Sequence, residues 1–251
     1  MLTAITRKPA QSVNDCELSF VERQMVSYEV ACEQHDQYER VLERFGCRVV
    51  TLPPLEDYPD SVFVEDTAVV LDEVAILCSP GAESRRGEVD SIEKELSEYR
   101  ETARISPPSF IDGGDVLTVG KTILIGNSGR TNRAGFESFS SIAGRFGYST
   151  ENVEVNSVLH LKSAVSALDD ETVLLNPAWL DVAHFKDFNI LEVCEELAAD
   201  HLRLGQDLVA SSSYPDTLQA VRDAGYKVTE VDISEFEKME AAVTCMSLVF
   251  N

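Results

Sequence analysis

Cys245 is the residue of this sequence best suited to covalent chemistry. It lies in residues 244–250, an apolar run of strand-forming residues that we predict to be a β-strand closing the fold. A free cysteine is most often a small buried hydrophobe. It can instead be a nucleophile when the fold brings a histidine and a carboxylate to it from distant parts of the chain. The segment alone leaves both interpretations open.

A histidine and several acids occur in positions that would serve such a cysteine. His160 is flanked by apolar residues, Asp60 begins a segment that ends in Glu65 and Asp66, and Asp112 precedes two glycines. Each has an ordinary explanation, because a lone histidine is often a satisfied core residue and acids are common in turns and helix caps. A pair of carboxylates in a pocket would, however, bind a planar guanidinium through two parallel hydrogen bonds.

Two arginines occupy equivalent places in the sequence. Arg85 lies in the polar segment 80–88 and Arg130 in the polar segment 126–132, and each segment follows an expected strand and opens an expected helix. The planar fork of an arginine can bind a carboxylate bidentately. An exposed surface arginine is the commoner case, but the repetition favours a shared role.

An internal repeat would position these residues. Three expected helices end at Gly46, Gly147 and Gly225, each followed by a strand, as a left-handed helix cap requires. Hairpins with polar turns lie between them, at residues 68–71 with 74–78, 116–119 with 122–125, 164–168 with 172–175 and 202–204 with 207–210. The predicted unit is strand, strand, helix, strand.

A polar residue precedes the first strand of every unit. These residues recur about every 40 to 50 positions, a period typical of blades or solenoid coils, and are Asp66, Asp115, His160, Asp200 and Cys245. The fifth unit must be completed by the N-terminal segment, whose helix is expected around residues 28–45. Such ring closure removes sheet edges. It would also bring these polar residues together in one central pocket.

Composition limits the classes of protein that this chain can be. A net charge of −23 disfavours nucleic-acid partners, which require clustered Lys and Arg, and could steer a cationic substrate. The sequence contains no apolar run of 18 residues, so we predict no membrane span, and the start of the chain lacks the pattern of a signal peptide. Six scattered cysteines without a CxxC pair favour a reducing cytoplasm over disulfides or structural zinc.

Six segments in this order are diagnostic when taken together. They are residues 60–66, 84–88, 112–115, 128–132, 159–163 and 244–247. In combination they resemble the dimethylarginine dimethylaminohydrolase family of the guanidine-modifying (amidinotransferase) superfamily. The resemblance covers nearly the whole chain. It implies an α/β fold, a five-bladed pseudosymmetric propeller closed by the N-terminal segment, in a single catalytic domain spanning residues 1–251.

The resemblance also implies catalytic roles. Cys245 would be the nucleophile and His160 the general acid and base, and Asp112 would contact both His160 and the substrate. Asp66, with Glu65, would hold the guanidinium group. The remaining matches imply a site for the amino-acid end of the substrate. Arg85 and Arg130 would bind its α-carboxylate. Asp60, the backbone of Met239 and a lid residue near Leu18, within residues 14–26, would bind its α-amino group.

The implied reaction converts Nω-methylated L-arginine to citrulline and an alkylamine through a covalent cysteine thiouronium. It requires no cofactor and no metal, and its partner is a small guanidino amino acid. Two alternatives remain open: the same chemistry on another guanidine such as arginine, and a non-catalytic propeller that binds a partner. The full set of Cys245, His160, Asp112 and Asp66 favours the enzyme. The sequence leaves the oligomeric state open, a homodimer included.

Overall fold

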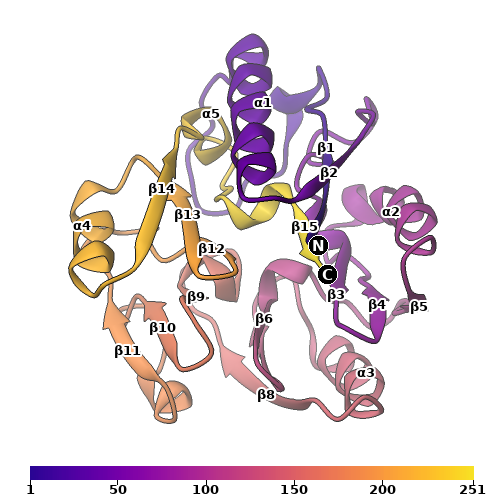
Figure 1. Ribbon diagram of the computed structural model, residues 1–251. Helices are drawn as coiled ribbons and strands as arrows, with labels where there is room; N and C mark the ends of the chain where they lie inside the picture. The colour runs from indigo at the N-terminus through magenta and orange to yellow at the C-terminus, as the bar shows by residue number, and fades with distance from the viewer.

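The computed structural model describes residues 1–251 as five three-stranded sheets arranged around a common centre (Figure 1). In every sheet the middle strand pairs antiparallel with one neighbour and parallel with the other. Four sheets use three consecutive strands: β3 (Ala68–Val70), β4 (Val74–Leu77) and β5 (Glu101–Arg104); β6 (Val116–Val119), β7 (Thr122–Asn127) and β8 (Ser149–Glu154); β9 (Val165–Ala167), β10 (Thr172–Leu175) and β11 (Asn189–Glu192); β12 (His201–Leu204), β13 (Asp207–Ser211) and β14 (Lys227–Val231). The arrangement is propeller-like.

The fifth sheet joins the two ends of the chain. It is formed by β15 (Leu248–Phe250), β1 (Thr3–Arg7) and β2 (Arg48–Leu52). β15 runs antiparallel to β1, with Phe250 opposite Thr3, and β2 runs parallel to β1. The two termini accordingly lie side by side (Figure 1). The N-terminal segment therefore supplies two strands of this sheet, and the C-terminal run supplies the third.

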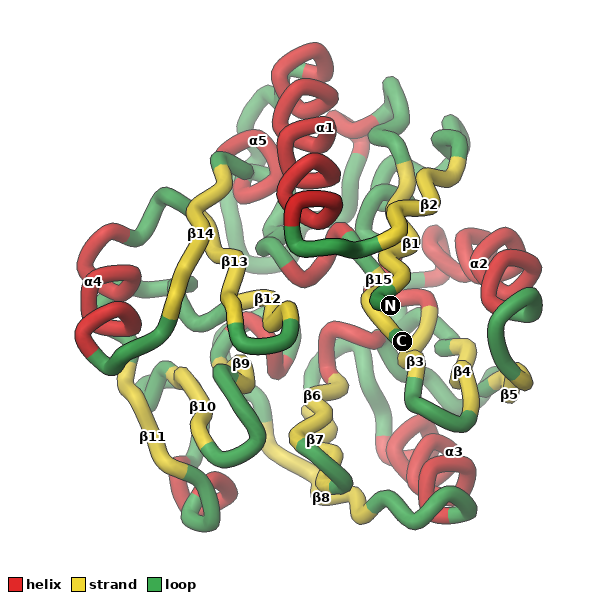
Figure 2. The backbone as a smooth tube through the Cα atoms, in the orientation of Figure 1, coloured by secondary structure: helices red, strands yellow, loops and turns green.

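Helices lie on the outside of the ring (Figure 2). Four units carry one between their second and third strands: α1 (Tyr28–Arg44), α2 (Val89–Leu96), α3 (Arg133–Gly144) and α4 (Pro215–Asp223). Glycines with positive φ follow three of them, at Gly46, Gly147 and Gly225, which confirms the predicted caps. None of the helices has both the length and the apolar character needed to span a membrane.

The unit formed by β9, β10 and β11 departs from the predicted repeat. Its connection from Leu175 to Asn189 contains a 3-10 turn, Val182–Phe185, where the other units have an α-helix. The connection is the shortest of the five and contains Pro177, which cannot continue a helix from the preceding residues.

The segment around Cys245 also differs from the prediction. Residues Thr244–Met246 form a 3-10 turn, and only Leu248–Phe250 form a strand. The N–H of Thr244 donates to the carboxylate of Asp200, 3.0 Å away, so it is not part of a sheet ladder. Similar 3-10 turns precede three other first strands, at Val64–Thr67, Gly113–Asp115 and Leu161–Ser163. Neighbouring turns of this set contact one another.

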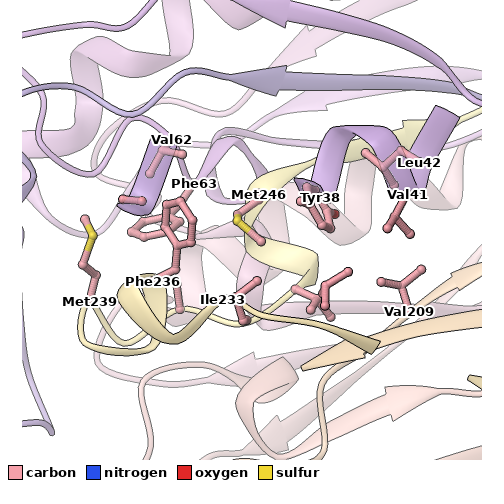
Figure 3. Close-up of a cluster of buried hydrophobic side chains, with 14 of the residues drawn as sticks. Tyr38, Val41, Leu42, Val62, Phe63, Val209, Ile233, Phe236, Met239 and Met246 are labelled. Atoms are coloured by element: carbon pink, nitrogen blue, oxygen red, sulfur yellow. The ribbon is translucent and has the colours of Figure 1, made fainter. Parts of the chain in front are cut away.

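The largest apolar cluster holds the cysteine turn in place (Figure 3). Met246 from the turn packs in the same cluster as Tyr38 of α1 and Phe236 of α5 (Ser234–Glu237). The Tyr38 hydroxyl lies 2.7 Å from the Ser247 hydroxyl, which ties α1 to the end of the turn. Burial of these side chains therefore fixes the backbone on both sides of Cys245.

Candidate functional site

A small cavity lies where the 3-10 turns meet. Its volume is about 20 Å³, and it is lined by Glu17, Asp60, Phe63, Asp66, Arg85, Arg130, Leu159, His160, Met239, Glu240, Ala241 and Cys245. Seven of the ten residues predicted for the site are therefore brought together from six separate stretches of the chain. A cavity of this size holds about one water molecule. A guanidino amino acid can enter only if part of the wall moves.

His160 connects two of the carboxylates. Its Nε2 atom lies 3.0 Å from Oδ2 of Asp112, and its Nδ1 atom lies 3.9 Å from Oδ1 of Asp66. Burial by itself would lower the pKa of His160, but the charge of Asp66, the hydrogen bond to Asp112 and the charge of Asp115 raise it to about 9. His160 is therefore an imidazolium at neutral pH. It can donate a proton.

Asp112 and Gly114 set the position of the imidazole. Oδ1 of Asp112 accepts the N–H of Gly81 at 2.8 Å, which leaves its other oxygen for His160. The N–H of Gly114 donates to Oδ1 of Asp66 at 2.9 Å. A Cβ atom on Gly114 would lie 2.6 Å from Nδ1 of His160, so only glycine allows the ring to approach this backbone.

Cys245 faces the same cavity as a neutral thiol. Its Sγ atom accepts the N–H of Ala242 at 3.4 Å. Burial raises the pKa of Cys245 well above its ordinary value, and the charges of Glu65, Asp200 and Asp66 raise it further. A thiolate therefore requires a positive charge nearby.

Asp66 is an ionised carboxylate that points into the cavity. Burial alone would raise the pKa of Asp66, but the positive charges of His160 and Arg85 lower it to about 2. Nη1 of Arg85 donates to Oδ2 of Asp66 at 2.5 Å. Asp66 thus remains charged at any physiological pH and can accept a hydrogen bond from a cation in the cavity.

The two arginines are not the matched pair that the sequence suggests. Arg85 is buried, and its guanidinium also donates to both carboxylate oxygens of Glu88 and to the carbonyls of Asp60 and Phe63. Almost all of its donors are thus used within the protein. Arg130 is half-buried, and its Nη2 atom donates to the Ser19 hydroxyl at 3.3 Å. Arg130 is the arginine whose fork is accessible.

Glu65 points away from the cavity, unlike its neighbour Asp66. Its Oε1 atom pairs with Lys162 at 2.5 Å, and its Oε2 atom lies 3.0 Å from the Thr244 hydroxyl. The difference from the prediction follows from the 3-10 turn Val64–Thr67, in which successive side chains diverge by about 120°. Glu65 therefore acts on the cavity through its charge rather than by direct contact.

Two of the three residues predicted to bind an α-amino group line the cavity. Asp60 and the buried Met239 both line it, and Oδ2 of Asp60 accepts the N–H of Glu17 at 3.0 Å. Leu18 is half-buried against the largest apolar cluster and is not among the lining residues. The backbone of Glu17, one residue earlier, occupies the place expected for it.

Glu240 holds the lid segment, residues 14–26, over the cavity. Its carboxylate accepts the backbone N–H groups of Ser19 at 2.7 Å, Val21 at 2.9 Å and Phe20. Glu240 also has a φ of +58°, a conformation that non-glycine residues adopt rarely and at some energetic cost. The carboxylate bonds offset this cost and close the cavity.

Some functional residues escaped the sequence analysis. Glu240, Lys162 and Thr244 have no signal of their own, because their partners are distant in sequence. Asp200 was marked only by its place in the repeat, yet it lies buried beside Thr244. The repeat period was the one signal that could have identified it.

The site also contains a group of residues with the spacing of metal ligands. One donor atom each of Asp66, Asp112 and His160 lie within 4.8 Å of one another. Two protein cations already balance these carboxylates, the Arg85 guanidinium and the His160 imidazolium. Each of the two carboxylates in this group thus has a protein cation as its partner.

Relatives of known type match this chain along its length. A family model described as eukaryotic N,N dimethylarginine dimethylhydrolase matches residues 4–173. The chain is 37% identical over 250 residues to the N(G),N(G)-dimethylarginine dimethylaminohydrolase of Pseudomonas aeruginosa, with 98% of each chain covered. It is 40% identical over 248 residues to the protein of that name from Streptomyces coelicolor, with 98% of this chain and 95% of that protein covered.

Solved structures match equally well. A cysteine-to-serine mutant of the Pseudomonas aeruginosa protein complexed with citrulline has a TM-score of 0.95 at 36% identity, with 100% of both chains covered. A histidine-to-glycine adduct of dimethylarginine dimethylaminohydrolase with S-methyl-L-thiocitrulline matches with the same TM-score and identity. The N-terminal domain of ArgZ, an arginine dihydrolase from cyanobacteria, has a TM-score of 0.88 at 17% identity, which shows a shared fold.

We expect Glu240→Ala to loosen the lid segment. The variant removes three bonds to a charged acceptor, each of which contributes about 1.5–3 kcal/mol. Amide hydrogen exchange at Ser19, Phe20 and Val21 should accelerate by at least about tenfold. Glu22→Ala, an exposed acid in the same segment, is the matched control. Equal exchange rates in the wild type and Glu240→Ala would show that other contacts hold the lid.

Proposed function

The chain belongs to the dimethylarginine dimethylaminohydrolase family of enzymes, and from this premise we propose that it hydrolyses Nω-methylated L-arginine to citrulline and an alkylamine through a covalent intermediate on Cys245. The observation that carries the proposal is the convergence of Cys245, the His160–Asp112 pair and the ionised Asp66 on one cavity. A binding module would have no need of a thiol beside an acid that can donate a proton.

The guanidinium group binds first, by charge. Asp66 accepts hydrogen bonds from its unmethylated face, and Glu65 adds a second negative charge from behind. Glu65 is the strongest of the charges that act on Cys245, so a cation bound next to the thiol also feels it. Phe63 and Met239 exclude water from the neighbouring wall. A carboxylate and a cation attract each other more strongly in such a dry site than in water.

The amino-acid end of the substrate lies towards the lid. We assign its α-carboxylate to the accessible fork of Arg130, with Arg85 adding positive charge from the wall. Asp60, the Met239 carbonyl and the lid backbone near Leu18 would bind the α-amino group. The N–H of Glu17 that now occupies Asp60 would be displaced as the lid admits the substrate.

The bound cation activates the nucleophile. Burial and the charges of Glu65 and Asp66 hold Cys245 in its thiol form, and a guanidinium placed beside these carboxylates offsets their charge. The thiolate is therefore favoured when substrate is present. It attacks the central guanidinium carbon while Nδ1 of His160, which faces Asp66, gives its proton to the methylated nitrogen. The C–N bond breaks, and a thiouronium and a neutral alkylamine result.

The same histidine completes the second half of the reaction. Neutral His160 takes a proton from water, and the oxygen attacks the thiouronium carbon. The C–S bond then breaks, the proton left on the ureido oxygen passes to the departing Cys245 sulfur, and the resting thiol and the neutral ureido group of citrulline result. His160 ends the cycle protonated, as its pKa of about 9 favours. Relatives trapped with citrulline in a cysteine mutant, and with a thiocitrulline in a histidine mutant, support this assignment by analogy.

We also propose that residues 1–251 form one catalytic domain, a five-bladed propeller closed by the pairing of β15 with β1. Six unpaired cysteines fit a reducing cytoplasm, which remains our prediction for its location.

The reaction is tested by replacing its nucleophile. With dimethylarginine as substrate we expect Cys245→Ser to form no measurable citrulline, because a serine hydroxyl at this position has no base strong enough to activate it. The fold, followed by circular dichroism, should be unchanged. Cys194→Ser, at the exposed cysteine, is the control and should keep full activity. Citrulline production by Cys245→Ser would exclude covalent catalysis at this residue.

The carboxylate site is tested with lysine in place of arginine. Arg130→Lys keeps the charge but loses the bidentate fork, so kcat/KM should fall by at least about tenfold, mainly through KM. Arg133→Lys, where the side chain is 90% exposed, is the matched control. An unchanged KM in Arg130→Lys would show that the α-carboxylate binds elsewhere.

Competition between substrates tests the preference for methylated arginine. Leu159 and Ala241 line the cavity with Cys245, and their side chains have no hydrogen-bond acceptor. A methylated nitrogen fits against such side chains. An unmethylated nitrogen there would lack a partner for its N–H, which costs about 1–3 kcal/mol. Dimethylarginine should therefore exceed arginine in kcat/KM by about tenfold or more. A tenfold preference for arginine would refute the substrate assignment but not the chemistry.

A further inference from the structure

The hydroxyl of Thr244, the residue before the nucleophile, lies between two carboxylates. Its Oγ1 atom is 2.6 Å from Oδ2 of Asp200 and 3.0 Å from Oε2 of Glu65. A hydroxyl carries one hydrogen and can donate to only one of them. The other contact would join two acceptors unless that carboxyl group carries a proton itself.

The surroundings show which carboxyl group carries the proton. Glu65 forms an ion pair with Lys162, so its charge has a partner. Asp200 forms no ion pair. It is 7% exposed, and its side chain has hydrogen bonds only to Thr244: Oδ1 accepts the backbone N–H at 3.0 Å, and Oδ2 contacts the hydroxyl. A neutral carboxylic acid fits this environment, because a buried charge without a partner is strongly disfavoured.

We propose that Asp200 is a positioning residue that acts as a neutral carboxylic acid, donating its proton to the Thr244 hydroxyl and so holding the turn that carries Cys245. Thr244 in turn donates to Glu65, which gives a directed chain of hydrogen bonds from Asp200 to Lys162. The inference rests on the proposed role of Cys245 as nucleophile. One oxygen of Asp200 accepts and the other donates, which is the pattern an asparagine side chain offers.

The proposal has a consequence for pH dependence. The ionisable groups around Asp200 are Glu65, Lys162, His201, Tyr38, Tyr214 and Cys245. Glu196, Glu237 and Glu240 share with Asp200 the lining of a cavity of about 300 Å³. Burial and the charge of Glu65 together raise the pKa of Asp200 to about 7, against the opposing bonds from Thr244 and the charge of Lys162.

The sign of the effect follows from the raised pKa. The neutral form stabilises the folded protein fully below the unfolded value of 3.8, and this contribution is lost as pH rises through about 7. Above that pH Asp200 no longer donates a proton to the Thr244 hydroxyl, and a third negative charge, beside those of Glu65 and Asp66, acts on the Cys245 thiol. Both effects oppose catalysis.

Replacing Asp200 by asparagine tests the donor role. At pH 6 we expect Asp200→Asn to keep kcat/KM within about threefold of the wild type and Asp200→Ala to lose at least about tenfold. At pH 8 about nine-tenths of wild-type Asp200 is ionised. The kcat/KM of Asp200→Asn divided by that of the wild type should therefore be about three- to tenfold higher at pH 8 than at pH 6. Glu196→Gln removes a charge from the same cavity without changing a contact of Thr244. Its kcat/KM relative to the wild type should be the same at pH 6 and pH 8.

A second measurement does not depend on turnover. The rate at which iodoacetamide alkylates Cys245 can be followed by peptide mass spectrometry, with the exposed Cys194 as reference. The alkylation rate of Asp200→Asn divided by that of the wild type should rise between pH 6 and pH 8 as the kcat/KM ratio does. A constant ratio overturns the inference even when citrulline is formed normally. A rise in the alkylation-rate ratio without citrulline formation supports the donor role of Asp200 and refutes the proposed function. If Asp200→Ala does not fold, the Asn to wild-type comparison still decides.

Discussion

The site depends on the balance of buried charges next to one thiol. Burial raises the pKa of Cys245, and the charges of Glu65, Asp66 and, when it is ionised, Asp200 raise it further, while Arg85, His160 and Lys162 pair with the carboxylates around it. In the proposed mechanism a bound guanidinium would offset the charges of Glu65 and Asp66 and so favour the thiolate of Cys245. Binding and activation would then be one electrostatic event.

The tight turns that precede the first strands make this arrangement possible. A 3-10 turn directs consecutive side chains about 120° apart, so neighbours in sequence serve opposite sides of the ring wall. In Val64–Thr67, Asp66 reaches the cavity while Glu65 pairs with Lys162 behind it. In Thr244–Met246, Cys245 faces the cavity while Thr244 bonds to Asp200 and Glu65. In both turns a residue that faces the cavity is therefore adjacent in sequence to one that bonds to the surrounding wall.

Closure of the lid is built from the same carboxylate chemistry. Glu240 accepts three backbone N–H groups of residues 19–21, and Asp60 accepts one from Glu17. In a cavity of about 20 Å³ these bonds take the place of a substrate. If the α-amino group of the substrate binds Asp60 as proposed, it competes with the N–H of Glu17, and substrate entry and lid release would be coupled through one acceptor. The cost of a left-handed backbone at Glu240 indicates that the fold maintains this contact.

The local sequence was sufficient for the repeat and for most of the site. Glycine caps, polar hairpin turns and a polar residue at a regular spacing are local signals, and they placed Asp66, His160 and Cys245 at corresponding points of a ring. The direction of a side chain within a turn cannot be predicted from the local sequence in this way, because the same residues can form either a 3-10 turn or the start of a strand. For this reason Glu65 and Arg85 took partners that the sequence did not indicate.

Only the tertiary structure decided which ionisable groups are charged. The protonation of Asp200, the imidazolium of His160 and the thiol of Cys245 all depend on burial and on charged groups roughly 40 to 180 residues away. Glu240 became a lid contact because the backbone of residues 19–21 passes above it, more than 200 residues distant in sequence. Residue types determined what chemistry was available. Packing determined which atoms carry the protons, because electrostatic free energy depends on distance and solvent exposure rather than on sequence order.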